Sequence, residues 1–215
     1  MSALIVKIEN NNLYKILVSK FRSLDVTGDS LVQVYKKLGH VFGVFLSNHF
    51  ILESSPIKTP TGAEYLGSKL DVGNILFVST FEDNDFFAQQ IGSFYENALY
   101  AKLDVDRKSK GWEANIVKVD LPKVNNIDTV IFCKSVLATG CTAKTILNEI
   151  VQHYNVSNVI VTSILGSQEA IDELSNEFKY LNIKYLVGEI DLLDSETGLL
   201  MPGVGQIEER LAKTA

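Results

Sequence analysis

From residue 74 to residue 191 the chain alternates between short apolar runs and longer segments with a helical period. Four apolar runs predict strands, at residues 74–80, 128–136, 157–165 and 183–191. Three amphipathic segments between them predict helices, at residues 86–99, 144–154 and 167–180. Apolar strands that alternate with such helices indicate parallel strands covered on both faces. Right-handed crossovers then predict an α/β fold with an open, doubly wound, mainly parallel sheet that binds ligands at the carboxyl ends of its strands.

The N-terminal part of the chain is expected to add helices to this sheet. Apolar residues at three- and four-residue spacing predict helices at residues 13–21 and 31–46, with Asp29 and Ser30 as caps of the second. The first 12 residues contain a short apolar patch but no basic leader and no small-residue cleavage site. This patch predicts a first strand or arm rather than an export signal.

The remaining segments are predicted to form extended structure and loops. Residues 49–69 lose the helical period and contain two prolines and a Thr-Gly pair, which predicts an extended, turn-rich arm. Two further strands are expected at residues 101–105 and 112–119, around a turn at residues 106–111. The chain then closes in a loop-rich ending, residues 199–211.

Length and charge limit the number of domains and the kinds of partner. A chain of 215 residues with 46% apolar content can bury one sizeable core, and no linker or repeat divides it, so we expect residues 1–215 to form a single domain. No apolar run approaches the roughly 20 residues of a membrane span, which predicts no membrane partner. A net charge of −6 without a basic block argues against nucleic acid. The short cluster Arg107, Lys108 and Lys110 fits a solvated hairpin tip.

The sequence shows no spacing typical of a metal site. Cys133 and Cys141 form neither a disulfide framework nor a zinc pattern, so we expect free thiols in a reducing, cytoplasmic environment. The three histidines are far apart in the sequence. Glu82, Asp83 and Asp85 could hold magnesium, but carboxylates are also typical of a solvated helix N-terminus, which is the favoured interpretation.

The segment Val136 to Thr145 has the features of a loop that cradles a phosphate. It joins a predicted strand to a predicted helix, and Gly140 allows its backbone to approach an anion closely. The first amides of the following helix would point their unpaired N–H groups at that anion. Three hydroxyl groups add further donors: Thr139, Thr142 and Thr145.

Two other kinds of loop share part of this pattern. A nucleoside-triphosphate loop is rejected, because Ala138 and Ala143 stand where that motif requires glycine. A plain strand-to-helix turn with Thr142 as the helix cap explains the local pattern equally well. The decision between turn and phosphate loop therefore depends on the rest of the chain.

Two motifs together resemble the uracil phosphoribosyltransferase family. The string VLATGCTA is similar to that family's phosphoribosyl pyrophosphate loop, and about 60 residues later GLLMPGVGQIEERL is similar to its uracil-binding ending. The TPTG arm at residues 59–62 and the N-terminal helices also match, so the resemblance covers essentially the whole chain. It implies a phosphoribosyltransferase-type sheet with a small hood for the base, and a cytosolic dimer or tetramer. It also implies that uracil and phosphoribosyl pyrophosphate give UMP and pyrophosphate, with Mg²⁺ as the cofactor if the protein is catalytic.

The resemblance assigns two groups of site residues. The phosphate and ribose of a nucleotide or of phosphoribosyl pyrophosphate would be bound by Arg107, Lys134, Ser135, Val136, Leu137, Ala138, Thr139, Gly140, Cys141 and Thr142. Cys141 replaces a glycine of the family. The base would be bound by Leu200, Gly205, Gln206 and Ile207, with Leu200 reading the uracil edge through its backbone. The resemblance also places Gly198, Pro202, Gly203 and Arg210 in the base pocket.

The departures from the family pattern fall mainly on charged positions. Glu82 stands where the family has a pyrophosphate-binding arginine, and Lys134 and Gln206 replace acidic residues near the ribose. Ser135 replaces a proline and Ile207 an alanine. The reaction develops charge on departing pyrophosphate, and loss of one oriented donor from such a site costs about 3 kcal/mol in the transition state.

These observations leave two functions from different classes. The first is a uracil phosphoribosyltransferase-like protein of pyrimidine salvage with a degraded pyrophosphate site. The second is a non-catalytic paralogue that binds a nucleoside monophosphate, as a sensor or as a partner subunit of an active enzyme. Failure to bind any nucleotide would instead favour a purely structural protein.

Overall fold

The computed structural model describes residues 4–8, 11–80, 83–107 and 114–213. Its main sheet consists of β1 (Leu4–Lys7), β4 (Ile75–Thr80), β5 (Leu99–Arg107), β6 (Ala114–Asp120), β7 (Thr129–Leu137), β8 (Asn158–Gly166) and β9 (Asn182–Ile190). Within the described residues the strand order is β1-β9-β8-β7-β4-β5-β6, and the neighbours run parallel except for the antiparallel pair β5 and β6. At the centre Val161 of β8 pairs with Phe132 of β7 and Tyr185 of β9.

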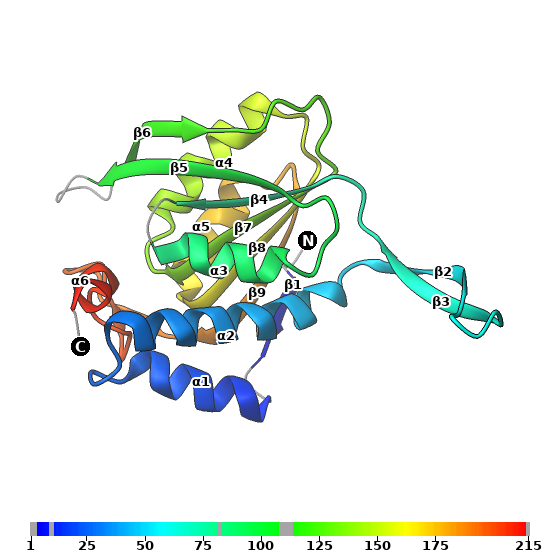
Figure 1. Cartoon of the computed structure of the whole chain (residues 1–215). Helices are drawn as coiled ribbons and strands as arrows, with labels where there is room; N and C mark the ends of the chain where they lie inside the picture. Colours follow the sequence, from blue (N-terminus) through cyan, green and yellow to red (C-terminus); the bar gives the residue numbers. More distant parts are fainter. Residues whose placement is uncertain (1–3, 9–10, 81–82, 108–113, 214–215) are drawn as a thin grey trace.

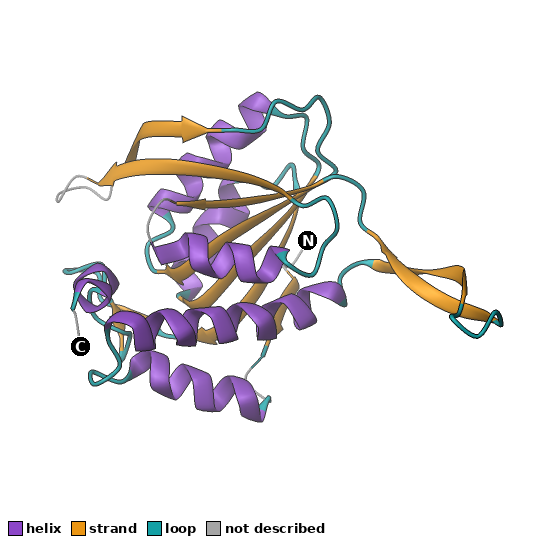
Figure 2. Cartoon of the chain, in the orientation of Figure 1, coloured by secondary structure: helices purple, strands orange, loops and turns teal. Residues whose placement is uncertain are grey.

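Helices cover both faces of this sheet, as Figures 1 and 2 show. One face carries α1 (Asn12–Arg22), α2 (Gly28–Ser47) and α3 (Asp83–Gly92), and the other carries α4 (Cys141–His153) and α5 (Gln168–Glu177). The predicted α/β, doubly wound and mainly parallel sheet is therefore confirmed.

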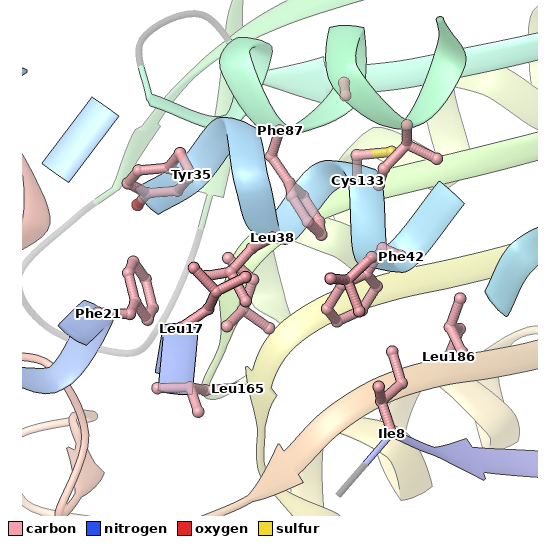
Figure 3. Close-up of a cluster of buried hydrophobic side chains, with 14 of the residues drawn as sticks. Ile8, Leu17, Phe21, Tyr35, Leu38, Phe42, Phe87, Cys133, Leu165 and Leu186 are labelled. Carbon is pink, nitrogen blue, oxygen red and sulfur yellow. The ribbon is translucent and has the colours of Figure 1, made fainter. Parts of the chain in front are cut away.

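The two faces of the sheet bury two hydrophobic clusters. The cluster under α1, α2 and α3 includes Phe21, Tyr35, Phe42 and Phe87, and Figure 3 shows these rings between the helices and the sheet. The cluster under α4 and α5 gathers mainly aliphatic side chains, together with Phe132, Tyr154, Phe178 and Tyr185. In β8 every residue after Asn158 is buried, which explains why the central strands are apolar without alternation.

Two smaller units extend from this core. An antiparallel hairpin of β2 (Ile51–Lys58) and β3 (Glu64–Asp71) projects away from the body. The predicted arm is thus extended, and its turn lies at Pro60 to Gly62. At the carboxyl ends of the parallel strands, β10 (Leu192–Leu193), β11 (Leu200–Met201) and α6 (Ile207–Ala212) form the small hood.

Two boundary predictions were wrong for identifiable reasons. The helix predicted at residues 86–99 ends at Gly92, because Tyr95 turns inward, where its ring packs against Phe50 and Phe77. The cap of α2 is Thr27 rather than Asp29 or Ser30; Asp29 lies in the first turn, and the Ser30 hydroxyl donates to the Thr27 carbonyl at 2.6 Å.

The ends of the remaining segments follow the predictions more closely. The N-terminal apolar patch forms β1, the edge strand beside β9. The strands expected at residues 101–105 and 112–119 correspond to β5 and β6. The turn expected at residues 106–111 begins later, because Asp106 and Arg107 still pair with β6, and residues 108–113 lie outside the described part of the chain. Among the described helices, none combines the length and the apolar character that crossing a membrane requires.

Candidate nucleotide site

The loop between β7 and α4 has the backbone geometry of an anion cradle. The strand β7 ends at Leu137, and Gly140 caps α4 in the left-handed region with φ 79° and ψ −9°. Its carbonyl accepts the first helical hydrogen bond, from the Lys144 N–H at 2.8 Å. The first N–H groups of an α-helix have no partner within the helix, so those of α4 face the end of the sheet with the positive end of the helix dipole.

A buried serine fixes the other side of this loop. The Ser167 hydroxyl donates to the Ala138 carbonyl at 2.5 Å, and the Ser167 N–H donates to the Leu137 carbonyl at 3.0 Å. The same hydroxyl accepts from the Ala170 N–H at 3.0 Å and so caps α5. Because two loop carbonyls bond to Ser167, they are held toward α5.

Thr139 and Cys141 bond to each other across the loop. The Thr139 hydroxyl donates to the Cys141 sulfur at 3.2 Å, and the Cys141 N–H donates to the Thr139 hydroxyl oxygen at 3.4 Å. Two groups that could bind a phosphate are therefore paired with each other. An incoming anion must replace these weak bonds.

The second motif lies opposite this loop. Leu200 and Met201 form β11, and the chain turns back through Gly203 and Gly205, both with positive φ, before α6 begins at Ile207. A side chain at Gly203 would overlap the Leu200 carbonyl, so the turn is closed tightly on itself.

The two motifs enclose one cleft of about 500 Å³, within the range of small-molecule sites. One wall is the run Lys134, Ser135, Val136, Leu137, Ala138, Thr139, Gly140, Cys141, Thr142 and Ala143. The other wall is Gly198, Leu199, Leu200, Met201, Pro202, Val204, Gly205, Gln206, Ile207 and Glu208. All expected site residues whose side chains the structure describes therefore line this single space, except Thr145, Gly203 and Arg210.

Charge distinguishes this cleft from a neighbouring hollow of about 630 Å³ that shares Thr139, Cys141 and Gly198 with it. The charged residues of the cleft are Lys134 and Glu208, whereas the hollow has one lysine and three carboxylates: Lys144, Glu169, Glu173 and Asp194. Lys144 is also bound to Glu173 and Glu177, at 2.8 and 2.9 Å. The cleft is therefore the better place for a phosphate.

The expected pyrophosphate side of the site is only partly visible. Glu82 lies outside the described residues, and Arg107 is described only as the last residue of β5. Of the acidic cluster, Asp85 accepts from the Lys102 ammonium and from the Gln89 amide, each at 2.7 Å. These contacts give the Asp85 carboxylate a structural role. Across the described part of the chain no group of three His, Cys, Asp or Glu side chains is arranged to hold a metal.

Three residues that contact the motif loops were missed by the sequence reasoning. Ser167 holds the phosphate loop, and Arg22 and Asp191 hold the turn at Gly203. Ser167 carries a recognisable local signal, since serine before an acidic helix start is a typical cap. Arg22 and Asp191 have no such signal, because their partners lie more than 165 positions away or across a loop.

Comparison with known proteins supports the family resemblance over nearly the whole chain. A family model described as uracil phosphoribosyltransferase matches residues 8–214. Among curated relatives, the uracil phosphoribosyltransferase of Aquifex aeolicus is 26% identical, covering 93% of this chain and 93% of its own length. That of Sulfolobus acidocaldarius is 24% identical, with 90% of this chain and 92% of its own length covered.

Solved structures show the same architecture. The AQ2163 protein from Aquifex aeolicus superposes with a TM-score of 0.85 and 25% identity, covering 97% of this chain and 98% of its own. Adenine phosphoribosyltransferase from Leishmania donovani superposes with a TM-score of 0.58 and 14% identity, covering 98% of this chain and 89% of its own, which shows a shared fold alone.

Proposed function

The chain belongs to the uracil phosphoribosyltransferase family, and from that premise we propose that its cleft binds UMP and forms it from uracil and phosphoribosyl pyrophosphate. In that reaction the bond between uracil N1 and ribose C1′ forms, the C1′–O bond to pyrophosphate breaks, and the N1 proton is released. The observation that carries the proposal is the single cleft lined by both motifs.

The proposed roles follow from the two walls. The α4 amides and the hydroxyl groups of Thr139 and Thr142 bind the 5′-phosphate, and the Lys134 ammonium adds positive charge. The backbone around Leu200 and the turn at Gly205 and the side chains of Gln206 and Ile207 bind the base. Arg107 contacts the pyrophosphate in the substrate complex.

The described cleft does not fit a magnesium ion held by the protein. Its single carboxylate is that of Glu208, and Lys134 repels a cation, whereas Mg²⁺ prefers carboxylate and phosphate oxygens. No step of the proposed reaction is therefore derived through a metal bound to protein side chains.

A second candidate, a UMP-binding paralogue without turnover, is favoured by one specific observation. Glu82 replaces a pyrophosphate-binding arginine of the family, and Lys134 and Gln206 replace its acidic residues near the ribose. The α4 amides and the backbone around Leu200 do not depend on these side chains, so the changes would slow transfer more than they weaken UMP binding.

Calorimetric titration with UMP and with uridine tests the proposed binding. We expect UMP to bind at least 100-fold more tightly than uridine, because the phosphate contributes charge-assisted bonds worth roughly 2.7 kcal/mol or more. Equal affinity for the two would contradict a phosphate subsite at α4.

Release of pyrophosphate from phosphoribosyl pyrophosphate and uracil, with Mg²⁺ supplied, distinguishes the two candidates. Turnover by the natural chain supports the transferase. A chain that binds UMP but releases no pyrophosphate is the paralogue, and the variant Glu82→Arg/Lys134→Asp/Gln206→Asp should then gain turnover. The matched control Glu64→Arg/Lys58→Asp/Gln152→Asp, at exposed positions away from the cleft, should gain none.

A further inference from the structure

An arginine and an aspartate hold both backbone polar groups of the turn at Gly203. The Gly203 N–H donates to the Asp191 carboxylate at 3.0 Å. The Gly203 carbonyl accepts from the Arg22 guanidinium at 2.9 Å. Gly203 lies between Pro202 and Val204, which both line the cleft. The position of this wall therefore depends on two side chains that do not line the cleft themselves.

Arg22 and Asp191 form a bidentate pair that is largely shielded from solvent. Each of the two terminal guanidinium nitrogens, Nη1 and Nη2, lies 2.8 Å from an Asp191 carboxylate oxygen. Nη2 also donates to the Glu189 carboxylate at 2.7 Å. The side chains of Arg22 and Asp191 are 19% and 5% exposed. Burial lowers the pKa of Arg22, but bonds with Asp191 and Glu189 offset this, so the pKa is raised and the guanidinium stays charged.

A second arginine fastens the same end of α1 to the loop. Buried Arg210 donates to the carbonyls of Phe21 and Val204 at 2.8 and 3.0 Å, and to those of Ser23 and Val26 at 2.7 and 2.8 Å. The backbone on either side of Arg22 is thereby held by α6. The backbone from which Arg22 reaches Gly203 is consequently fixed, and the planar guanidinium loses little conformational freedom when it forms its hydrogen bonds.

The phosphate loop has a separate anchor. Its carbonyls bond to Ser167, directly before α5. The described side-chain hydrogen bonds of Arg22, Asp191 and Glu189 connect these residues to one another and to Gly203, and do not reach that loop. Loosening the turn at Gly203 should therefore move the base wall while the phosphate wall stays in place.

We infer that Arg22 and Asp191 are positioning residues of the base subsite, which set the distance and tilt of the Leu200–Gln206 wall against the nucleobase. This inference rests on the proposed function. Its consequence is selective: loss of the pair weakens binding of a nucleotide through its base and leaves binding of a sugar phosphate nearly unchanged.

The test compares UMP with ribose 5-phosphate by calorimetry on Arg22→Gln, Arg22→Lys and the natural chain. For Arg22→Gln we expect a 10- to 100-fold loss of UMP affinity and less than a twofold change for ribose 5-phosphate. Arg22→Lys keeps the positive charge but not the bidentate guanidinium, so its UMP affinity should lie between those of the natural chain and Arg22→Gln. The matched control Lys20→Gln removes an exposed positive charge from the same turn of α1 and should bind both ligands normally.

Arg22→Gln leaves Asp191 as a buried unpaired charge, which can prevent folding. The double variant Arg22→Gln/Asp191→Asn removes both charges and should show the same selective loss of UMP affinity. Unchanged UMP affinity in a folded variant would overturn this inference and leave the proposed function standing. An equal loss of affinity for UMP and ribose 5-phosphate would do the same. Failure of the natural chain to bind UMP would overturn the proposed function together with this inference.

Discussion

At the phosphate loop, the bonds between Thr139 and Cys141 show how one side chain can compete with a ligand. The Thr139 hydroxyl donates its hydrogen bond to the Cys141 sulfur, and the Cys141 N–H donates to the Thr139 hydroxyl oxygen. A glycine at position 141 would leave the hydroxyl proton without this acceptor. The donors of the loop would then be available to a phosphate at lower cost.

We predict that Cys141→Gly raises the affinity for UMP about three- to tenfold, the equivalent of one weak hydrogen bond. The measurement is a calorimetric titration of the purified variant. Cys141→Ser, which retains an acceptor for the Thr139 hydroxyl, is the control and should bind UMP like the natural chain. Weaker binding by Cys141→Gly would show that the thiol supports the loop instead of competing with the ligand.

The two cysteines should differ sharply in reactivity. Cys133 is fully buried in the sheet, and desolvation raises the pKa of its thiol to about 12. A raised thiol pKa favours the neutral form, so the reactive thiolate of Cys133 is scarce at pH 8. Cys141 lines the cleft and is half-buried.

A disulfide reagent at pH 8 should therefore modify Cys141 quickly and Cys133 only after unfolding. Saturating UMP should slow the reaction at Cys141 at least fivefold, because the nucleotide covers the loop. The Cys141→Ser variant controls for the assignment and should show no rapid phase. Rapid modification of both thiols in the folded protein would contradict the burial of Cys133.

Among the elements, α5 connects the helix layer to the phosphate loop through its cap. The Ser167 hydroxyl bonds at once to the Ala138 carbonyl and to the Ala170 N–H. Loss of this hydroxyl would leave a loop carbonyl and a helix N–H without a partner in the interior. Stability and ligand binding should therefore fall together at this position.

We predict that Ser167→Ala lowers the free energy of unfolding by about 1–3 kcal/mol, as loss of a cap and of a buried bond does. Urea unfolding measures this change, and UMP affinity should drop at least threefold in the same variant. The control Ser19→Ala removes an exposed hydroxyl that bonds within its own helix, and its effect should stay below about 0.5 kcal/mol. A stable Ser167→Ala variant with normal UMP binding would contradict the anchoring role.

The projecting hairpin is the most conspicuous feature of the whole molecule (Figure 1). Its exposed apolar side chains are Ile51, Leu52, Ile57, Tyr65 and Leu66. The register places Leu52 and Leu66 on one face and the other three on the opposite face. A lone two-stranded hairpin is marginally stable in water, and apolar side chains exposed on both of its faces are typical of a protein contact. Together with the oligomer that the family resemblance implies, this favours a hairpin that packs against a second copy of the chain.

We predict that Leu52→Lys/Leu66→Lys lowers the molar mass measured by light scattering during gel filtration. In the hairpin register both positions lie on one face, and their side chains are 65% and 68% exposed, so the change should not disturb the core. Leu24→Lys changes a leucine that is 86% exposed elsewhere and should leave the mass unchanged. A natural chain that is already monomeric would remove this role for the hairpin.

The features that the sequence predicted correctly are those that depend on neighbouring residues. The apolar runs of β7, β8 and β9 identify buried parallel strands because each strand must be apolar on both faces. The turn from β7 into α4 is recognisable because Gly140 and the helix start act within a few residues of one another. That residues 198–208 line the same cleft as this turn is something that no local pattern could predict.

Tertiary structure alone decided which distant residues meet. The Arg22–Asp191 pair joins positions 169 residues apart, and the order of the strands brings α1, the end of β9 and the turn at Gly203 together. Packing of Tyr95 against Phe50 and Phe77 ended α3 earlier than its helical period suggests. The physical reason is that periodicity and caps act over a few residues, whereas these contacts depend on the topology of the sheet, which brings together segments that are remote in sequence.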